Sequence, residues 1–152
     1  MAEPRPIPSR MVPLVKWLMR VMSRTQVWVY RVSRGKLAST FRGAPVCLLT
    51  MTGRKTGRRR TLPLIYVTHG DDVLLVASQG GLDIHPLWYH NLVANPDVEV
   101  QVAGEKRPLR ARRATPEEKQ QLWPAMVAVY PDFDQYQART ERDIPLMICS
   151  PR

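Results

Sequence analysis

The chain has 152 residues, a length that suits a single domain. Hydrophobic residues make up 44% of it, which allows a full core and excludes a disordered chain. The net charge of +10 is uneven, because residues 1–70 carry 14 Lys or Arg against one acid while residues 71–152 carry 9 against 12. This division indicates an anionic partner for the N-terminal half, or else a basic surface that is merely solvated.

The cysteines and histidines argue against a metal site or a secreted protein. Cys47 and Cys149 lie in apolar runs without metal-ligand spacing, which predicts buried thiols in a reducing compartment. His69, His85 and His90 lack the spacing of ligands on one helix face. Since there is neither a signal-peptide core nor an uncharged run of about 18 residues, we expect a cytoplasmic protein without a transmembrane helix.

The N-terminal segment has two parts. Residues 1–10 are rich in proline and are predicted to be a disordered tail, and residues 11–35 are predicted to be an amphipathic helix. Its apolar positions are Met11, Val15, Trp17, Leu18, Val21, Met22, Trp28 and Val29, and its cations are Lys16, Arg20, Arg24 and Arg31. A basic helix of this kind is typical of a membrane-surface anchor. The alternative is a helix docked on the domain with its cations in solvent.

Six short apolar runs alternate with turn signals along the rest of the chain. They predict strands over residues 46–51, 61–68, 73–78, 98–102, 107–114 and 144–149, with short helices over 85–96, 115–130 and 131–139. Hairpin spacing makes the sheet mainly antiparallel, and strands that must hide their edges favour a small barrel. The fold class is therefore α+β, with residues 36–152 forming the barrel domain.

A basic turn separates the first two predicted strands. Five cations fall within residues 54–60, flanked by Gly53 and Gly57 and without an acid. Only three residues separate the glycines, so this is not a phosphate-binding P-loop. A glycine-flanked turn rich in Arg and Lys suits a phosphate or carboxylate ligand, although many hairpin tips carry charge for solubility alone.

The chain shows no nucleophile constellation, but it has an aromatic cluster. Trp88 and Tyr89 lie in one predicted helix, and Tyr130, Phe133 and Tyr136 share a face of another. Core packing explains such rings, and so does stacking on a flat heteroaromatic ligand. A hydride-transfer enzyme needs no nucleophile of its own because its cofactor carries the chemistry.

Several segments together resemble a known family. They are Leu49–Gly57 with Arg60 and Pro63, Ala77–Gly81, His85–Pro96, Tyr130-Pro131, Tyr136-Gln137, Thr140 and Ile144-Pro145. In this order they closely resemble the deazaflavin (F420)-dependent nitroreductase family, of the F420H2-dependent quinone reductase type. The similarity runs from about Met11 to the C-terminus.

The resemblance implies a fold, a cofactor and a setting. It implies a split β-barrel of the flavin-reductase kind and an oxidoreductase that uses reduced coenzyme F420 to reduce a quinone-like or nitroaromatic acceptor. The family is actinobacterial, several members are membrane-associated, and the closest look monomeric. We therefore expect a monomer bound peripherally to the inner face of the cell membrane through the N-terminal helix, with no nucleic-acid partner.

The resemblance also assigns residues. Cofactor contacts are expected at Arg54, Lys55, Thr56, Gly57, Arg60, Pro63, Val76, Ala77, Ser78, Gln79, Gly80, Leu87, Trp88 and Asn91. Substrate contacts are expected at Ile65, Tyr66, Tyr130, Phe133 and Tyr136, with Ser78, Tyr130 and Tyr136 orienting the acceptor or relaying a proton. F420 carries a phosphodiester and an oligoglutamate tail, which suits the basic turn, with Thr56 and Gly57 offering backbone N–H groups. Arg58 and Arg59 are expected at the rim, and the N-terminal helix is expected to serve lipid rather than the cofactor.

Some positions depart from the family pattern. Gln79 stands where members often have lysine, and nitroimidazole-reducing members carry tyrosines at the positions of Ile65 and Phe133. Quinone reduction is therefore favoured over nitroimidazole activation. Two alternatives remain open, namely an FMN-dependent oxidoreductase of the same fold and a non-catalytic basic module that binds nucleic acid or membrane.

Overall fold

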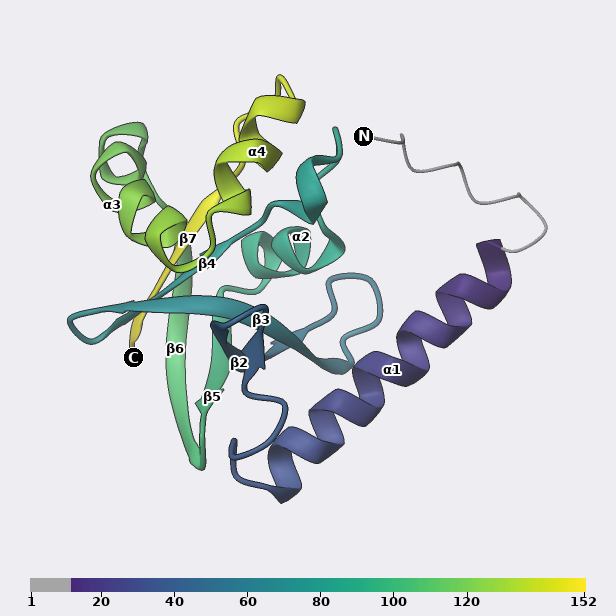
Figure 1. Cartoon of the computed structure of the whole chain (residues 1–152). Coiled ribbons are helices and arrows are strands. Elements are labelled where there is room, and N and C mark those ends of the chain that lie inside the picture. Colours follow the sequence, from purple (N-terminus) through teal and green to yellow (C-terminus); the bar gives the residue numbers. More distant parts are fainter. Residues whose placement is uncertain (1–11) are drawn as a thin grey trace.

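The computed structural model describes residues 12–152, in which a barrel of antiparallel strands is accompanied by four α-helices (Figure 1). The elements are α1 (Val12–Val32), β1 (Thr40–Phe41), β2 (Ala44–Thr52), β3 (Arg59–His69), β4 (Asp72–Val76), the 3-10 turn η2 (Gln79–Gly81), α2 (Leu87–Ala94), β5 (Asp97–Val102), β6 (Glu105–Arg113), α3 (Pro116–Val129), α4 (Asp132–Arg139) and β7 (Leu146–Pro151). The predicted elements are all present, with ends shifted by a few residues, and the two-residue strand β1 is an addition.

The barrel closes because β2 has a partner on each side. The strand order is β2-β3-β4-β7-β6-β5, and β5 pairs back with β2. Each pairing is antiparallel, and closure removes the free edges that an open sheet would expose. The predicted split β-barrel is confirmed. Among the shifted boundaries, that of β4 bears on the site, since β4 ends at Val76 and Ser78 lies in the loop that follows.

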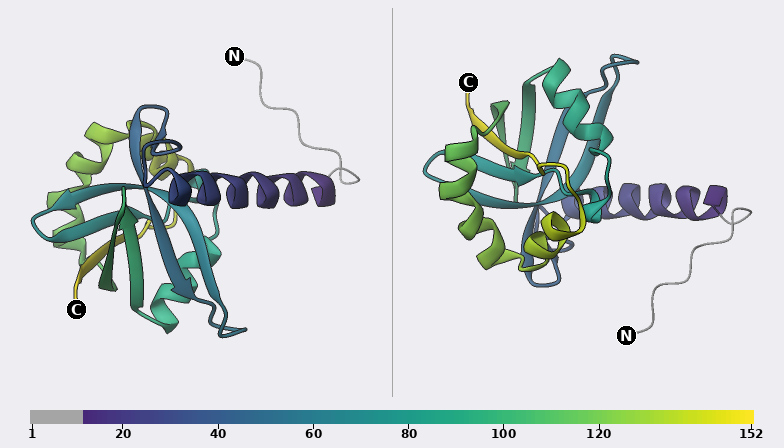
Figure 2. Two further views of the ribbon diagram at one scale, coloured as in Figure 1. Left: turned by 90° about the horizontal axis from the view of Figure 1, so that it is seen from below. Right: turned by 90° about the horizontal axis from the view of Figure 1, so that it is seen from above.

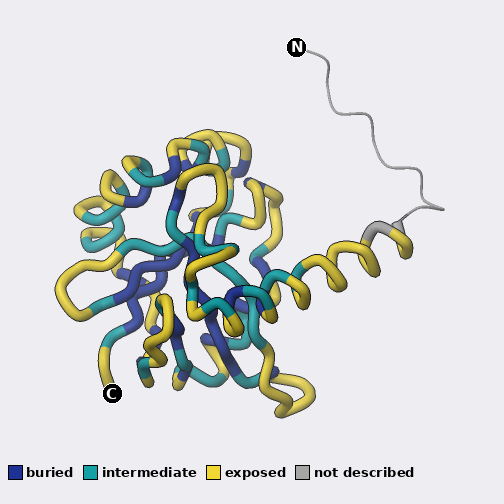
Figure 3. Tube along the Cα trace, turned by 60° about the horizontal axis from the view of Figure 1, so that its bottom comes forward, coloured by how far each residue is buried: buried dark blue, intermediate teal, exposed yellow. Residues whose placement is uncertain are grey.

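Side-chain alternation along the strands divides the core into two parts. Inside the barrel, Leu49, Leu75 and Val100 are fully buried. On the outer face of β4 and β7, Leu74 and Ile148 pack with residues of α3 and α4. Figure 3 shows the buried trace running through the strands. The sheet is therefore covered on one outer face by α3 and α4.

Both cysteines lie inside the barrel, as predicted. Cys47 and Cys149 are free thiols and are fully buried. Burial raises the pKa of Cys149 to about 12 and also raises the pKa of Cys47. These thiols stay protonated at neutral pH and act as small apolar side chains.

Helix α1 docks on the barrel only through its C-terminal turns. Val27 and Tyr30 are buried against Leu48, and the Tyr30 hydroxyl accepts a hydrogen bond of 2.8 Å from the Ala103 amide. The N-terminal turns project away from the barrel (Figures 1 and 2). The predicted helix is confirmed from Val12 onward; Met11 and the predicted tail lie outside the described residues.

The most apolar face of α1 turns away from the barrel. Its exposed large side chains are Leu14, Trp17, Leu18, Met19, Val21, Met22, Trp28 and Val32. Leu14, Leu18 and Val21 follow helical spacing, so they form one stripe that continues to Trp28 and Val32. Within residues 12–152, no helix is long and apolar enough to cross a membrane.

Helix α3 begins with a capping box. The Thr115 hydroxyl accepts from the Glu118 amide at 3.2 Å, and the Glu118 carboxylate accepts from the Thr115 amide at 2.8 Å. Arg112 adds a bidentate pair, with both N–O distances 2.7 Å. The hydrogen bonds from Arg112 hold the pKa of Glu118 at about 2, against an ordinary value of 4.5.

This carboxylate makes stability depend on pH in a defined window. Because the folded pKa is depressed, its contribution is fully present above pH 4.5 and is lost as pH falls towards 2. We expect Glu118→Gln to lose stability relative to the wild type at pH 7 but to converge with it near pH 2. Thermal melts across this range check the expectation, and Glu117→Gln is the matched control. Parallel curves for Glu118→Gln and the wild type would contradict it.

Candidate functional site

A groove made of three adjoining cavities runs along one side of the barrel. The inner cavity, of about 350 Å³, is lined by Gln26, Phe41, Val46, Pro63, Leu64, Ile65, Val76, Ser78, Gly80, Tyr130, Phe133 and Tyr136. The middle cavity, of about 640 Å³, is lined by Arg20, Ser23, Arg24, Met51, Arg60, Thr61, Leu62, Gln79, Pro86, Leu87, Trp88 and Asn91. The outer cavity, of about 360 Å³, is lined by Arg20, Gly53, Arg54, Lys55, Thr56, Arg60, Leu87 and Asn91. The middle and outer cavities share Arg20, Arg60, Leu87 and Asn91, and the turn η2 lies between the middle and inner cavities, since Gln79 lines the first and Gly80 the second.

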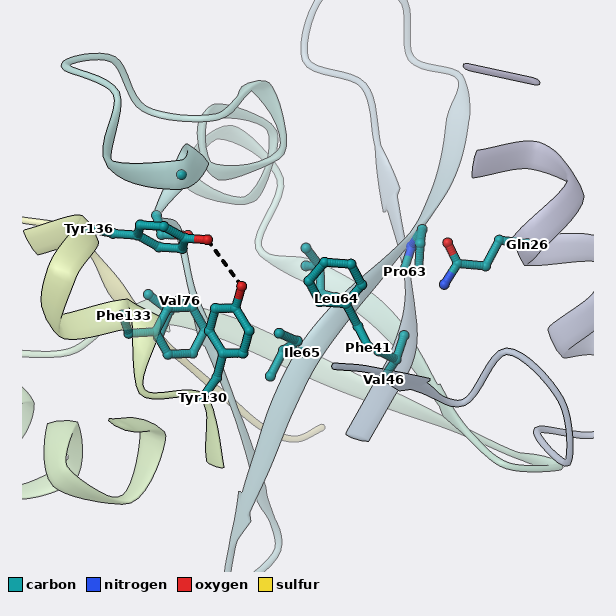
Figure 4. Close-up of a pocket in the computed structure, with 12 residues that line it drawn as sticks. Gln26, Phe41, Val46, Pro63, Leu64, Ile65, Val76, Tyr130, Phe133 and Tyr136 are labelled. Atoms are coloured by element: carbon teal, nitrogen blue, oxygen red, sulfur yellow. Dashed lines mark hydrogen bonds between the residues drawn. The ribbon is translucent and has the colours of Figure 1, made fainter. Parts of the chain in front are cut away.

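The inner cavity is largely apolar and carries a pair of tyrosines. The hydroxyls of Tyr130 and Tyr136 lie 3.0 Å apart and point towards each other across the cavity (Figure 4). Burial, and then the hydrogen bond to Tyr136, raises the pKa of Tyr130 to about 12. Since each hydroxyl both donates and accepts, one satisfies the other and the pair keeps an O–H for a ligand.

The middle and outer cavities are strongly basic. Five cationic side chains line them, namely Arg20, Arg24, Arg54, Lys55 and Arg60. Within the described part of the chain, no carboxylate lies within 4.0 Å of these five. Gathered like charges repel each other, so this end of the groove favours an anionic ligand.

The tip of the β2–β3 hairpin, which bears Arg54 and Lys55, is held in a defined turn. The Gly57 amide donates to the Gly53 carbonyl, and the Gly53 amide donates to the Arg58 carbonyl, both at 2.8 Å. The Asn91 side chain of α2 accepts from the Arg54 amide at 3.0 Å. The turn itself therefore uses the Gly57 amide, which the resemblance had assigned to the ligand. Asn91 positions the loop as well as lining the groove.

The loop after β4 is fastened by an arginine that sequence reasoning missed. The guanidinium of Arg142 donates to the carbonyls of Ser78 and Leu82, both at 2.7 Å, and to the Ala77 carbonyl at 3.3 Å. It also donates to His85 Nδ1 at 2.9 Å. Burial, and then the Arg142 charge, lowers the pKa of His85, which keeps Nδ1 free as an acceptor. About 60 positions separate these partners, so no local pattern reveals the contact.

A close approach also sets this loop against α4. Gly81 has φ +79°, and a Cβ there would lie 2.8 Å from the Tyr136 carbonyl oxygen. Gln79 adopts a positive φ of 49° without being glycine. Glycine at position 81 thus permits the backbone contact that brings η2 and Tyr136 to the same cavity.

The groove brings together all but three of the predicted site residues. Gly57 lines none of the three cavities, and Ala77 is fully buried in the barrel interior. Tyr66 packs against the interior core, whereas Ile65 faces the inner cavity. Successive residues of a strand point to opposite faces, so Ile65 and Tyr66 cannot both serve that cavity with their side chains.

Helix α1 supplies lining residues that were not predicted. Arg20, Ser23 and Arg24 border the middle cavity, and Gln26 borders the inner one. Phe41 and Val46 complete the inner wall. Helix α1 therefore borders the groove, whereas the sequence predicted a helix that serves lipid rather than the cofactor. The spacing of its cations is visible in the sequence, but the face that docks on the barrel is not.

Arg142→Lys should loosen the loop over the inner cavity. Lysine keeps the charge but cannot reach several carbonyls and His85 in one planar arrangement. Losing charge-assisted hydrogen bonds should lower the free energy of unfolding by about 2 kcal/mol. Urea denaturation measures this loss, and amide exchange at Gly81 and Leu82 should accelerate. Arg110→Lys, on the exposed face of β6, is the control. An equal loss of stability in both variants would contradict the role of Arg142 in fastening the loop.

Comparisons with known proteins agree with the family resemblance seen in the sequence motifs. The model of the F420H(2)-dependent quinone reductase family matches residues 22–151. Rv3178 of Mycobacterium tuberculosis is 42% identical over 118 residues, which cover 77% of this chain and 99% of the relative. The F420H(2)-dependent quinone reductase Rv1261c of the same organism is 38% identical over 128 residues, covering 82% of this chain and 86% of the relative.

A solved structure of a reductase that depends on F420-H2 (FDR-A) is also similar. It superposes with a TM-score of 0.66 at 40% identity and covers 70% of this chain and 94% of that one. Another solved chain, described as a domain-swapped dimer, has a TM-score of 0.68 at 32% identity and covers 93% of this chain and 100% of its own. The family match spans most of the chain and every residue named in the groove except Arg20, and the resemblance predicted from the motifs is confirmed. The chain belongs to the F420H(2)-dependent quinone reductase family.

Proposed function

We propose that this chain is an oxidoreductase that passes a hydride from reduced coenzyme F420 to a quinone-like acceptor. One observation carries the proposal, namely the union of a cation-lined end and an apolar, tyrosine-bearing end in a single groove. Family membership supports it. Family membership favours neither the FMN-dependent enzyme nor the non-catalytic basic module.

The cationic end suits the anionic part of F420. Arg54, Lys55 and Arg60 would hold its phosphodiester and glutamates, and Thr56 lies beside them. The amides of Lys55 and Thr56 have no backbone partner among the described residues, so they remain available to an anion. A single phosphate, as in FMN, would leave several of these cations uncompensated.

The apolar end suits the flat ring system and the acceptor. Pro63, Val76, Gln79 and Gly80 would border the deazaflavin, with Leu87 and Trp88 closing from α2. The bound reduced deazaflavin supplies the hydride. Ser78, Tyr130 and Tyr136 would hold the acceptor oxygen and donate a proton to it.

A quinone suits the inner cavity better than a nitroaromatic. Ile65 and Phe133 present hydrocarbon where nitroimidazole-reducing relatives would offer hydroxyls, while the tyrosine pair still reaches a carbonyl oxygen. Titration with F420 followed by turnover with a menaquinone analogue tests the assignment. Binding at micromolar concentration and F420H2 oxidation that depends on the quinone are expected. Absence of F420 binding would overturn the proposal, and release of FMN from the purified protein would favour the flavin alternative.

We further propose that α1 lies on a membrane surface through its exposed apolar stripe. Leu14, Leu18 and Trp28 are about half exposed or more, and Leu14 and Leu18 line none of the cavities that adjoin α1. Tryptophan and leucine on one helix face insert into the boundary between headgroups and acyl chains. A quinone dissolved in the bilayer would then reach the inner cavity over a short path.

A second copy of the chain is the competing occupant of this stripe. The solved relative described as a domain-swapped dimer makes self-association a real alternative to the expected monomer. Sedimentation with vesicles of mixed neutral and anionic lipid, beside light scattering of the free protein, separates the two. Trp17→Ser with Leu18→Ser should abolish vesicle binding and leave the mass unchanged. A fall of the molecular mass from that of a dimer to that of a monomer would instead contradict the membrane proposal.

A further inference from the structure

We propose that Arg20 and Arg24 of α1 bind the anionic tail of the cofactor, so that α1 supplies a basic wall of the groove. This inference rests on the proposed use of F420. Arg20 lines both the middle and the outer cavity, Arg24 lines the middle one, and Arg60 lines both cavities with them. The family resemblance assigned cofactor contacts to the hairpin, to the loop after β4 and to α2, but none to this helix.

Helical spacing places these arginines on the docked face of α1. Arg20, Arg24, Val27 and Arg31 recur at intervals of three or four residues and form one stripe. Val27 is buried against the barrel, and Arg31 donates to the Thr61 hydroxyl at 3.0 Å. The contacts of Val27 and Arg31 therefore hold Arg20 and Arg24 over the cavities.

The distribution of charge favours a long polyanion. The cations extend from Arg24 in the middle cavity to Arg54 and Lys55 in the outer one, over volumes of about 640 and 360 Å³. One phosphate reaches only a few of them. A chain of carboxylates reaches them in succession, and each guanidinium can hold a carboxylate through two parallel hydrogen bonds. An oligoglutamate tail has this chemistry.

Lipid contacts and tail contacts fall on different faces of α1. The exposed apolar stripe that begins at Leu14 and Leu18 turns away from the barrel, and the arginine stripe faces it. Lys16 is exposed and lines none of the three cavities. The helix therefore has separate faces for the two partners, and its groove-facing charges can be removed while the apolar face is kept.

Equilibrium binding to two forms of the cofactor tests the proposed contacts of Arg20 and Arg24. The probes are F420 with several glutamates and the analogue that ends at the phosphodiester, each titrated by fluorescence or calorimetry. Arg20→Ala with Arg24→Ala should weaken binding of the long form by about 10-fold to 100-fold, since each arginine loses a charge-assisted contact. Binding of the short form should change less than about 3-fold, because the hairpin cations remain. Alanine preserves the helix.

A matched variant and a salt series complete the test. Lys16→Ala with Lys36→Ala removes the same charge from exposed positions and should leave both affinities unchanged. For the long form, the salt dependence of binding should be shallower in the arginine variant than in the wild type. If the arginine variant bound both forms equally more weakly, or bound neither more weakly, the proposed contacts of Arg20 and Arg24 with the tail would be overturned. Loss of vesicle binding with cofactor affinity intact would overturn them too, because it assigns the arginines to lipid. A wild-type protein that binds neither form would instead refute the use of F420 itself.

Discussion

Replacing Lys55 and Arg60 together by alanine should raise the dissociation constant for coenzyme F420 by roughly 100-fold or more. Both side chains line the outer cavity, and Arg60 also lines the middle one. A hydrogen bond to a charged group contributes about 1.5–3 kcal/mol, so two lost contacts correspond to a factor of about 100 or more before screening, and solvent screening of these exposed side chains places the expected effect at the lower end. Fluorescence titration of the cofactor measures the change.

Folding should hardly change in this variant. Lys55 and Arg60 are exposed and have no ion pair within the described residues, so the melting temperature should stay within about 2 °C of the wild type. Lys106→Ala with Arg110→Ala, on the exposed side of β6, removes the same charge and serves as control. If both double variants weakened F420 binding alike, the effect would reflect net charge alone and the assignment of the hairpin would fail.

Tyr30→Ala should cost the largest share of stability among the changes considered, about 3–5 kcal/mol for a fully buried aromatic ring. Tyr30 is 1% exposed, packs in the cluster with Val27 and Leu48, and receives the Ala103 amide on its hydroxyl. Tyr30→Phe keeps the ring and should cost only about 1 kcal/mol for the lost hydrogen bond. Urea denaturation gives both values.

Tyr30→Ala should also weaken the binding of the cofactor. Detaching the C-terminal turns of α1 would withdraw Arg20 and Arg24 from the groove, so the affinity for long-tailed F420 should fall with stability. Trp28→Ala is the control on the same helix, because Trp28 is 64% exposed and lies outside the buried cluster of Val27, Tyr30 and Leu48. Equal destabilisation by Tyr30→Ala and Trp28→Ala would contradict the docking of α1 through its inner face.

The strands and the basic turn follow from local pattern. Apolar runs such as Val46–Met51 are bounded by turn residues, and hairpin spacing leaves antiparallel pairing as the simple solution. The gathering of Arg54, Lys55 and Arg60 near Pro63 also follows, because all four lie in or beside one hairpin. Alternation along β3 also predicts that the side chains of Ile65 and Tyr66 face opposite sides of the strand. The sequence alone could therefore have shown that these two side chains do not both contact one substrate.

Other features depend on contacts between distant segments. Arg142 reaches the carbonyls of Ala77 and Ser78 only because α4 and β7 return beside the end of β4. Nothing in the neighbourhood of Arg142 in the sequence marks it as the clamp of a loop some 60 residues earlier. Long-range hydrogen bonds of this kind leave no periodic trace, so sequence patterns cannot find them.

The sequence by itself determined the barrel, the family and the basic hairpin, because each rests on short-range periodicity or on contiguous motifs. Tertiary structure alone decided which face of α1 meets the barrel. The helix carries an apolar stripe and an arginine stripe, and amphipathicity predicts that the apolar one should dock. The barrel instead accepts Val27 and Tyr30, so the arginines turn towards the groove and the tryptophans turn outward. Which face of a helix is buried depends on the surface to which the chain returns, and that surface exists only after the strands have closed.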